Sequence, residues 1–96
     1  GGENVDASKV ESAIAAHPSV AEVFILGIED NKWGQIIAAT IVLKENEKLS
    51  EQELKKYLID KLVAYMIPKK FLFLDSIPKT QLGKVEREKI KALFIR

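Results

Sequence analysis

The residues best suited to chemistry lie in a short segment near the C-terminus, Pro78–Lys84. A lysine beside a glycine in a loop can reach a phosphate group, and Gly83 would let such a loop move. The segment is not a P-loop, because that motif needs a glycine six residues before the lysine and a serine or threonine directly after it. Pro78 and Val85 occupy those positions here. Lys84 is therefore a candidate anion-binding residue, and an ordinary surface lysine is the alternative.

Aromatic side chains suggest a second binding chemistry. Trp33 is the only tryptophan, and it lies in a polar segment directly before Gly34. A lone tryptophan usually packs in the core, but one in a loop can stack on a flat ligand such as a nucleotide base. Tyr65 could do the same. His17 is a weaker candidate, because a histidine at the end of a helix usually interacts with the helix dipole.

Two adjacent glycines, Gly1 and Gly2, precede the first predicted helix. They let the backbone adopt positive φ and let another group approach closely, and a helix N-terminus nearby favours an anion. A plain loop is the alternative. A Gly-Gly start is also unusual for a natural chain, so we expect the sequence to be a fragment of a larger protein.

Composition excludes several classes of protein. The 96 residues include no cysteine and one histidine, which excludes a disulfide scaffold, a cysteine nucleophile and a thiolate or two-histidine metal site. We therefore expect no metal bound by this chain. The length suits one small domain, and the longest strongly apolar run, Ile36–Leu43, is too short to span a bilayer. The absence of cysteine fits a cytoplasmic location.

Charge is unevenly distributed along the chain. Residues 1–64 hold 7 basic and 11 acidic side chains, whereas residues 65–96 hold 8 basic and 3 acidic ones. The basic end predicts contact with an anion, and a solvated helix face is the alternative. A stand-alone nucleotide- or nucleic-acid-binding module is a further alternative. No aromatic-rich strand accompanies the basic residues, so nucleic acid is not an expected partner.

Secondary-structure elements in the order α-β-β-α-β-α must position these residues. Apolar residues at helical spacing predict the helices, and β-branched runs predict the strands. Asp6 should cap the first helix, and Ser50 with Glu53 should form a capping box for the second. The predicted helices cover 7–16, the segment after Ser50 and 85–95, the predicted strands cover 20–28, 35–43 and 71–74, and 29–32 and 77–84 are predicted as turn and loop. The fold class is α+β, a three-stranded and mostly antiparallel sheet with flanking helices.

Several segments, taken in order, resemble motifs of the AMP-forming adenylating enzymes. This family includes acyl-CoA synthetases, luciferases and the adenylation domains of peptide synthetases. Gly1–Val5 resembles the family's G-G-E-N-[IV], and His17–Val23 resembles its H-P-x-V-x-[ED]-[AV]. Lys32–Gln35 resembles x-W-G-[EQ], and Ile77–Val85 resembles L-P-[KR]-T-x-x-G-K-[IV]. The resemblance covers almost the whole chain.

The resemblance implies that residues 1–96 are the C-terminal lid domain of such an enzyme, with the large N-terminal domain absent. Enzymes of this family form an acyl-adenylate from ATP and a carboxylic acid, and then transfer the acyl group to a thiol, usually that of CoA. ATP and Mg²⁺ would be bound mainly by the N-terminal domain, which would be the partner of this chain. We expect an acid–CoA ligase, similar to o-succinylbenzoate–CoA ligases, whose isolated C-terminal domain is inactive in the overall reaction. An adenylation domain that serves a carrier protein is the alternative.

The resemblance also implies roles for single residues. Lys84 matches the lysine that enters the active site during adenylation, where a fixed ammonium would offset the repulsion between a carboxylate and the α-phosphate. Gly1, Gly2 and Glu3 match the glycine-rich edge that lines the tunnel for the thiol.

Three further residues match positions that flank the CoA nucleotide in some CoA ligases: Trp33, Tyr65 and Lys69. Ile67 stands where these relatives usually carry a basic residue just before the proline. That departure weakens the assignment of a contact with the CoA phosphates.

Overall fold

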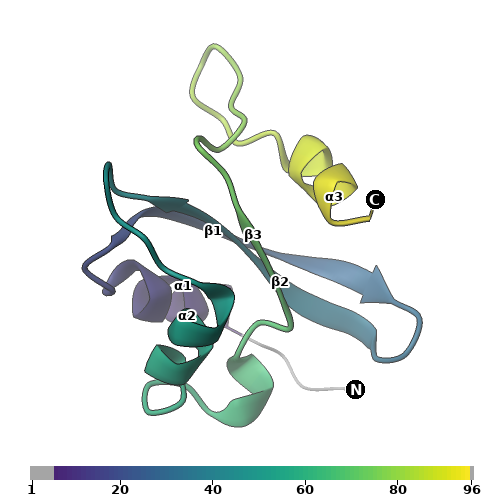
Figure 1. The fold of residues 1–96 in the computed structure, drawn as a ribbon. Coiled ribbons are helices and arrows are strands. Elements are labelled where there is room, and N and C mark those ends of the chain that lie inside the picture. The colour runs from purple at the N-terminus through teal and green to yellow at the C-terminus, as the bar shows by residue number, and fades with distance from the viewer. Residues whose placement is uncertain (1–5, 96) are drawn as a thin grey trace.

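A three-stranded sheet in the order β1-β2-β3 lies between helices that cover both of its faces (Figure 1). The computed structural model describes residues 6–95. The helices are α1 (Ala7–Ala15), α2 (Glu51–Leu58) and α3 (Arg87–Ile95), with a short 3-10 helix η1 (Ala64–Met66) before the last strand. The strands are β1 (Val20–Asp30), β2 (Gly34–Leu43) and β3 (Lys70–Phe73). The predicted order and the α+β class are confirmed.

β1 and β2 form a long antiparallel hairpin, which the β-branched residues of both segments favour. Its pairs run from Val20 opposite Leu43 to Asp30 opposite Gly34. β3 pairs with the other edge of β2 and runs parallel to it, because α2 and η1 return the chain to the end at which β2 began. The sheet is therefore mixed, with the longer part of its ladder antiparallel.

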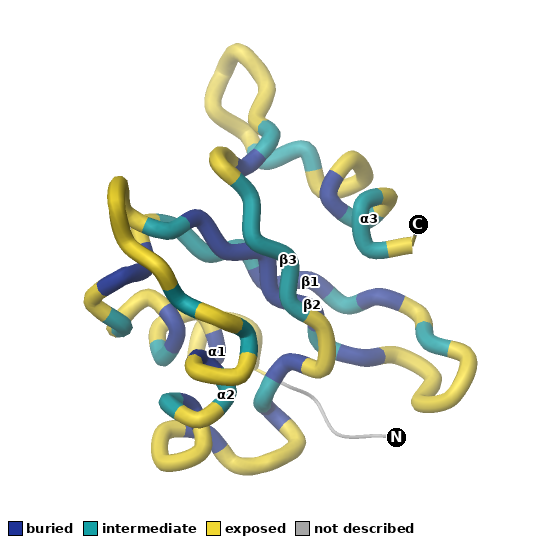
Figure 2. The backbone as a smooth tube through the Cα atoms, in the orientation of Figure 1, coloured by how far each residue is buried: buried dark blue, intermediate teal, exposed yellow. Residues whose placement is uncertain are grey.

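Alternate residues of the strands face opposite sides of the sheet, so two separate clusters are buried. Helices α1 and α2 cover one cluster, and α3 covers the other. The first cluster comprises Val10, Ile14, Val20, Ile25, Ala39, Ile41, Leu54, Leu58, Leu62 and Met66. The second comprises Leu26, Ile28, Ile36, Ala38, Val42, Ile77 and Ile90. The continuous apolar sequence of β2 thus reflects burial on both faces, and Figure 2 shows that exposure is concentrated in the helices and loops around the sheet.

Side-chain caps begin the first two helices at the predicted residues. Asp6 Oδ1 accepts hydrogen bonds from the backbone N–H of Ser8 at 3.0 Å and from its hydroxyl at 2.7 Å. Ser50 Oγ accepts the N–H of Glu53 at 3.0 Å, and Glu53 Oε1 accepts the N–H of Ser50 at 2.9 Å. The hydroxyl and N–H of Ser8 lower the pKa of Asp6 below its ordinary value. The backbone N–H and then the hydroxyl of Ser50 lower the pKa of Glu53 in the same way.

Two element boundaries differ from the prediction by two residues, and those of α1, β2 and β3 differ by one. β1 continues two residues further than expected, to Asp30, whose partner across the hairpin is Gly34, so the turn is shorter than predicted. α3 begins two residues later than expected, at Arg87, because Val85 forms an antiparallel bridge with Lys79. Both differences lengthen paired backbone at the expense of a predicted loop or helix. Within residues 6–95, the helices are all too short or too polar to cross a membrane.

Candidate functional site

Lys84 lies in a tight hairpin that projects from the body of the domain between β3 and α3 (Figure 1). The N–H of Thr80 donates to the carbonyl of Lys84 at 2.8 Å, and the N–H of Gly83 donates to the carbonyl of Thr80 at 2.9 Å. The hydroxyl oxygen of Thr80 accepts the N–H of Lys84 at 3.2 Å. Thr80 therefore holds both backbone groups of Lys84, while the lysine itself is exposed.

Gly83 gives this hairpin its shape. Its φ is +87°, in the left-handed region that side chains with a Cβ adopt at a cost. A Cβ at this position would have no atom within 4 Å, so the requirement for glycine comes from the backbone and not from crowding. A tight turn followed by a left-handed glycine is a common way to close a short hairpin loop. Gly83 thus fixes where the Lys84 backbone leaves the turn.

The base of the hairpin is attached to the rest of the domain at several points. The N–H of Glu86 donates to the carbonyl of Pro78 at 2.9 Å, and Lys79 forms a backbone bridge with Val85. The ammonium of Lys79 also pairs with the carboxylate of Glu22 on β1 at 2.6 Å. These contacts direct the exposed tip away from the sheet, and Figure 2 shows the tip as a continuous exposed segment.

Trp33 occupies the turn between β1 and β2 and does not pack in the core. It is 57% exposed, so the interpretation of this residue as a core tryptophan is wrong. The carboxylate of Asp30 accepts the N–H groups of Lys32 and Trp33 at 3.0 and 2.9 Å, and Gly34 follows with a φ of +81°. This arrangement is an aspartate turn, which leaves the indole on the surface.

Lys69 lies over the indole of Trp33. Its ammonium is 4.2 Å from the ring centroid, and that of Lys32 is 5.2 Å from the same centroid. The structure therefore brings together two of the three residues predicted to flank a nucleotide. An open depression of about 430 Å³ lies beside them and is lined by Trp33, Lys55, Ala64, Ile67, Pro68 and Lys69. An exposed aromatic ring with adjacent ammonium groups is suited to a ligand that has a planar ring and phosphates.

Tyr65 and Ile67 lie on either side of Met66 at the end of η1. Tyr65 is 56% exposed and does not line the depression, so the structure does not join it to Trp33 and Lys69, although its neighbour Ala64 is part of the lining. Ile67 lines the depression with an apolar side chain at the position noted above as a departure from the family pattern. Lys55 lines the same depression from α2.

The contacts of His17 are with the backbone and with a neighbouring aromatic ring. Its Nδ1 accepts the backbone N–H of Ser19 at 3.0 Å, and its ring packs edge-on against Tyr57 with the centroids 4.6 Å apart. The hydroxyl of Ser19 in turn donates to the carboxylate of Glu47 at 2.7 Å. These contacts hold the connection between α1 and β1 and favour the structural interpretation of His17.

The remaining candidates do not fall on described structure. Gly1, Gly2 and Glu3 lie outside residues 6–95. Within those residues, no group of three or more histidine, aspartate and glutamate side chains is placed to hold a metal ion.

Sequence reasoning missed residues that position the candidates without themselves contacting a ligand. Asp30 sets the Trp33 turn, Thr80 holds Lys84, and Glu22 binds Lys79. The spacing Asp30-x-x-Trp33-Gly34 was a usable signal for an aspartate turn. The pair formed by Glu22 and Lys79 had no local signal, because it joins residues far apart in the sequence.

Comparison with known proteins gives consistent matches. Residues 9–84 match the family described as the AMP-binding enzyme C-terminal domain. A long-chain-fatty-acid–CoA ligase of Mycobacterium tuberculosis is 44% identical over 85 residues, which are 88% of this chain and 17% of that protein. A 2-succinylbenzoate–CoA ligase of Bacillus cereus is 36% identical over 93 residues, which are 97% of this chain and 19% of that protein.

Solved structures show the same relationship. The o-succinylbenzoate–CoA synthetase of Bacillus subtilis, in complex with its acyl-adenylate intermediate, superposes with a TM-score of 0.82 at 41% identity. The superposition covers 95% of this chain and 18% of that one. The chain thus spans less than a fifth of the length of the relatives it matches.

Proposed function

Because the chain belongs to the AMP-binding enzyme C-terminal domain family, we propose that it is the lid domain of an ATP-dependent acid–CoA ligase. Such an enzyme converts a carboxylic acid and ATP into an acyl-adenylate and pyrophosphate, and then transfers the acyl group to the thiol of CoA. The proposal assigns ATP and Mg²⁺ mainly to the large N-terminal domain of the same enzyme. A cytoplasmic location is part of the proposal.

The single observation that carries this proposal is the presentation of Lys84. Its side chain is exposed at a projecting hairpin, and Thr80 and Gly83 fix its backbone. Adenylation brings an anionic carboxylate up to an anionic α-phosphate, so a positioned ammonium lowers the barrier by offsetting this repulsion and by stabilising the charge on the phosphoryl oxygens. We assign that role to Lys84.

The second half-reaction uses a different part of the domain in this proposal. Trp33 and Lys69 would hold the nucleotide of CoA, and Tyr65 is a further candidate. Stacking of adenine on the indole and pairing of a phosphate with the ammonium would each contribute about 1 kcal/mol or more. Gly1, Gly2 and Glu3 would form the edge of the tunnel through which the thiol approaches.

The exposed indole with its adjacent ammonium favours CoA over a carrier protein as the acyl acceptor. A carrier protein brings its pantetheine arm without a free nucleotide, so a nucleotide-stacking site would have no use in that reaction. We therefore retain CoA as the acceptor.

Nucleic-acid binding is a separate alternative, which two ion pairs disfavour. Lys79 pairs with Glu22 and Lys89 pairs with Glu86, so part of the positive charge of the basic end is neutralised.

The experiment is the substitution Lys84→Ala in the full-length enzyme, with the two half-reactions measured separately. We expect acyl-adenylate formation, followed as pyrophosphate release, to fall by about a hundredfold or more, because one positioned electrostatic contact is removed. Thioester formation from a supplied acyl-adenylate and CoA should remain near the wild-type rate.

Lys89→Ala is the matched control, since Lys89 is an exposed lysine close to the same hairpin on α3. It should leave both half-reactions unchanged. Near-normal pyrophosphate release by Lys84→Ala would contradict the assigned role.

A further inference from the structure

Leu82 is the most exposed of the large apolar residues in the described part of the chain, at 97%. It lies between Gln81 and Gly83 at the tip of the Lys84 hairpin. Nothing in the geometry of the turn requires a leucine there, since the hydrogen bonds that close the turn use Thr80 and the backbone. Such tight turns more often carry glycine, asparagine, aspartate or serine, whose exposure to water costs nothing.

The exposure of Leu82 differs from that of the other apolar residues on the surface. Trp33 and Tyr65 keep almost half of their surface covered by the domain, whereas Leu82 is almost fully in water. Single exposed apolar residues are common and need no explanation by themselves. Leu82 calls for one because it shares a short, closed turn with the residue assigned to catalysis.

Leu82 and Lys84 are held as one unit. Gly83 alone separates them, so their Cα atoms are at most about 7 Å apart. The bonds from Thr80 to Gly83 and Lys84 close the turn, and the bridge between Lys79 and Val85 closes its base. A surface that receives the Lys84 ammonium therefore lies within reach of Leu82.

We propose that Leu82 is the apolar anchor that seats this hairpin on the large N-terminal domain during acyl-adenylate formation. The inference rests on the function proposed for Lys84. Leu82 is a positioning residue, which acts through the placement of Lys84 and touches no reacting atom. Its partner is an apolar depression of the N-terminal domain beside the entrance to the adenylation site, because burial of a leucine side chain is the only interaction that this residue can provide.

The test uses Leu82→Ser in the full-length enzyme with the two half-reactions measured separately. Burial of a leucine side chain would stabilise the seated hairpin, so pyrophosphate release should slow by about 10- to 100-fold. Thioester formation from a supplied acyl-adenylate should stay within about threefold of wild type, because that step does not use the seated hairpin. Leu82→Met should restore adenylation, since methionine offers similar apolar volume.

Gln81→Ser is the matched control, because Gln81 is an exposed neighbour in the same turn. It should leave both half-reactions unchanged. The melting temperature of the full-length Leu82→Ser variant should also remain unchanged, which separates an anchoring role from a folding defect.

Two results would overturn the anchor. One is adenylation by Leu82→Ser at the wild-type rate, and the other is an equal loss in both half-reactions. The Lys84→Ala variant distinguishes this failure from failure of the proposed function. If Lys84→Ala loses adenylation and Leu82→Ser does not, the proposed function is supported and the anchoring role of Leu82 is contradicted. Normal adenylation by Lys84→Ala would contradict both proposals.

Discussion

The residues at the candidate sites owe their placement to local backbone conformations that the sequence encodes only in part. Gly83 is the clearest case. Its neighbours predict a loop that contains a flexible glycine, but the structure gives it a φ of +87° in a closed turn. Its role in the hairpin is then conformational, and a substitution there should act through backbone strain.

Gly83→Ala should reduce adenylation by the full-length enzyme by about 5- to 30-fold, because a Cβ in the left-handed region costs about 1–2 kcal/mol. Space is not limiting, since no atom lies within 4 Å of the added Cβ. Gly83→Asn is the control, because asparagine tolerates this region better. Pyrophosphate release should therefore be fastest in the wild type, slower in Gly83→Asn and slowest in Gly83→Ala. An equal loss in the two variants would contradict backbone strain as the cause.

The position of Trp33 on the surface could not be predicted from that residue alone. A polar segment followed by glycine left both a core and a surface role open for this tryptophan. What decided between them was the carboxylate of Asp30, which accepts two successive N–H groups and turns the chain so that the indole faces water. The contact of Lys69 with that indole depends on the placement of β3 beside β2, so no local pattern predicts it, and only the family resemblance grouped the two residues.

Among the elements, α1 and α2 were predicted best at their N-termini, where Asp6 and Ser50 cap them. The capping box of Ser50 and Glu53 combines short-range side-chain chemistry with an amphipathic stripe, so local sequence decides where α2 begins. The direction of β3 is not decided locally, since it depends on where α2 and η1 return the chain. No local pattern in four residues can specify it, and this is why the parallel pairing was not predicted.

The capping box leads to a prediction about acid stability. Hydrogen bonds from Ser50 keep the folded-state pKa of Glu53 below its ordinary value of 4.5. A lowered pKa stabilises the fold above the unfolded-state value, and this contribution is lost as the pH falls through the folded-state value. The free energy of unfolding should therefore decrease as the pH is lowered from about 5 to 3.

Ser50→Ala should lower the free energy of unfolding by about 1 kcal/mol at pH 7, as loss of an N-cap usually does. It should also reduce the decrease between pH 5 and 3, because Glu53 loses the Ser50 hydroxyl while the backbone N–H of residue 50 still donates to its carboxylate. Urea denaturation followed by circular dichroism measures both. Ser12→Ala, in the exposed part of α1, is the control and should neither destabilise the chain nor alter the pH dependence. An unchanged acid slope in Ser50→Ala would contradict the linkage.

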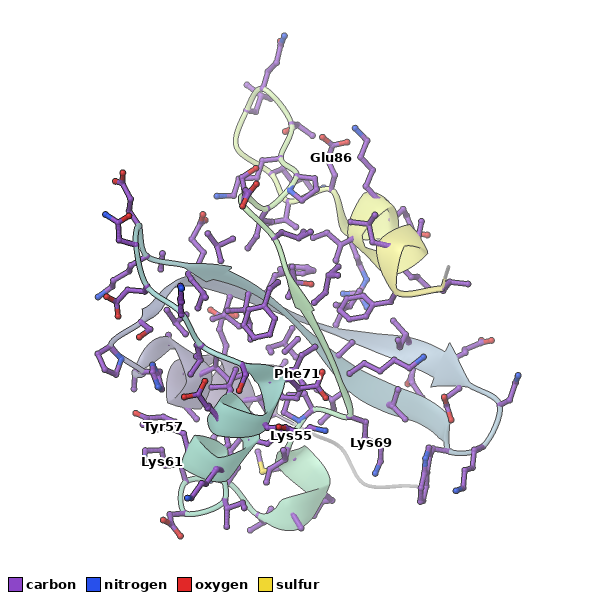
Figure 3. The ribbon with its side chains drawn as sticks, in the orientation of Figure 1. Lys55, Tyr57, Lys61, Lys69, Phe71 and Glu86 are labelled. Carbon is purple, nitrogen blue, oxygen red and sulfur yellow. The ribbon has the colours of Figure 1, made fainter. Side chains whose placement is uncertain are left out.

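At the scale of the whole molecule, the two candidate sites lie apart on one small domain. Figure 3 shows Lys69 beyond one end of β3 and Glu86, at the base of the Lys84 hairpin, beyond the other. The domain measures 35 × 29 × 23 Å along its principal axes. Sites separated in this way share no partners, so substitutions at each should affect one half-reaction and should combine additively.

Lys69→Ala should weaken use of CoA and spare adenylation. Loss of a cation over the indole and of its contact with a phosphate removes about 1 kcal/mol or more, so the KM for CoA should rise by about fivefold or more. Pyrophosphate release should be unchanged. Lys70→Ala, one residue further along, is the control. Quenching of Trp33 fluorescence during a CoA titration of the full-length enzyme reports the nucleotide site directly.

The separation also explains why one domain would serve two steps in sequence. Both sites are attached to the same sheet, with two cores that fix the helices to it, so any reorientation of the domain moves them together. An orientation that brings Lys84 to the carboxylate and the α-phosphate then directs Trp33 and Lys69 elsewhere. With one orientation for each half-reaction, the double variant should show the Lys84→Ala loss in pyrophosphate release and the Lys69→Ala loss in thioester formation. Neither loss should be larger than in the corresponding single variant. A Lys69→Ala enzyme that lost both half-reactions together would show instead that the two sites act at once.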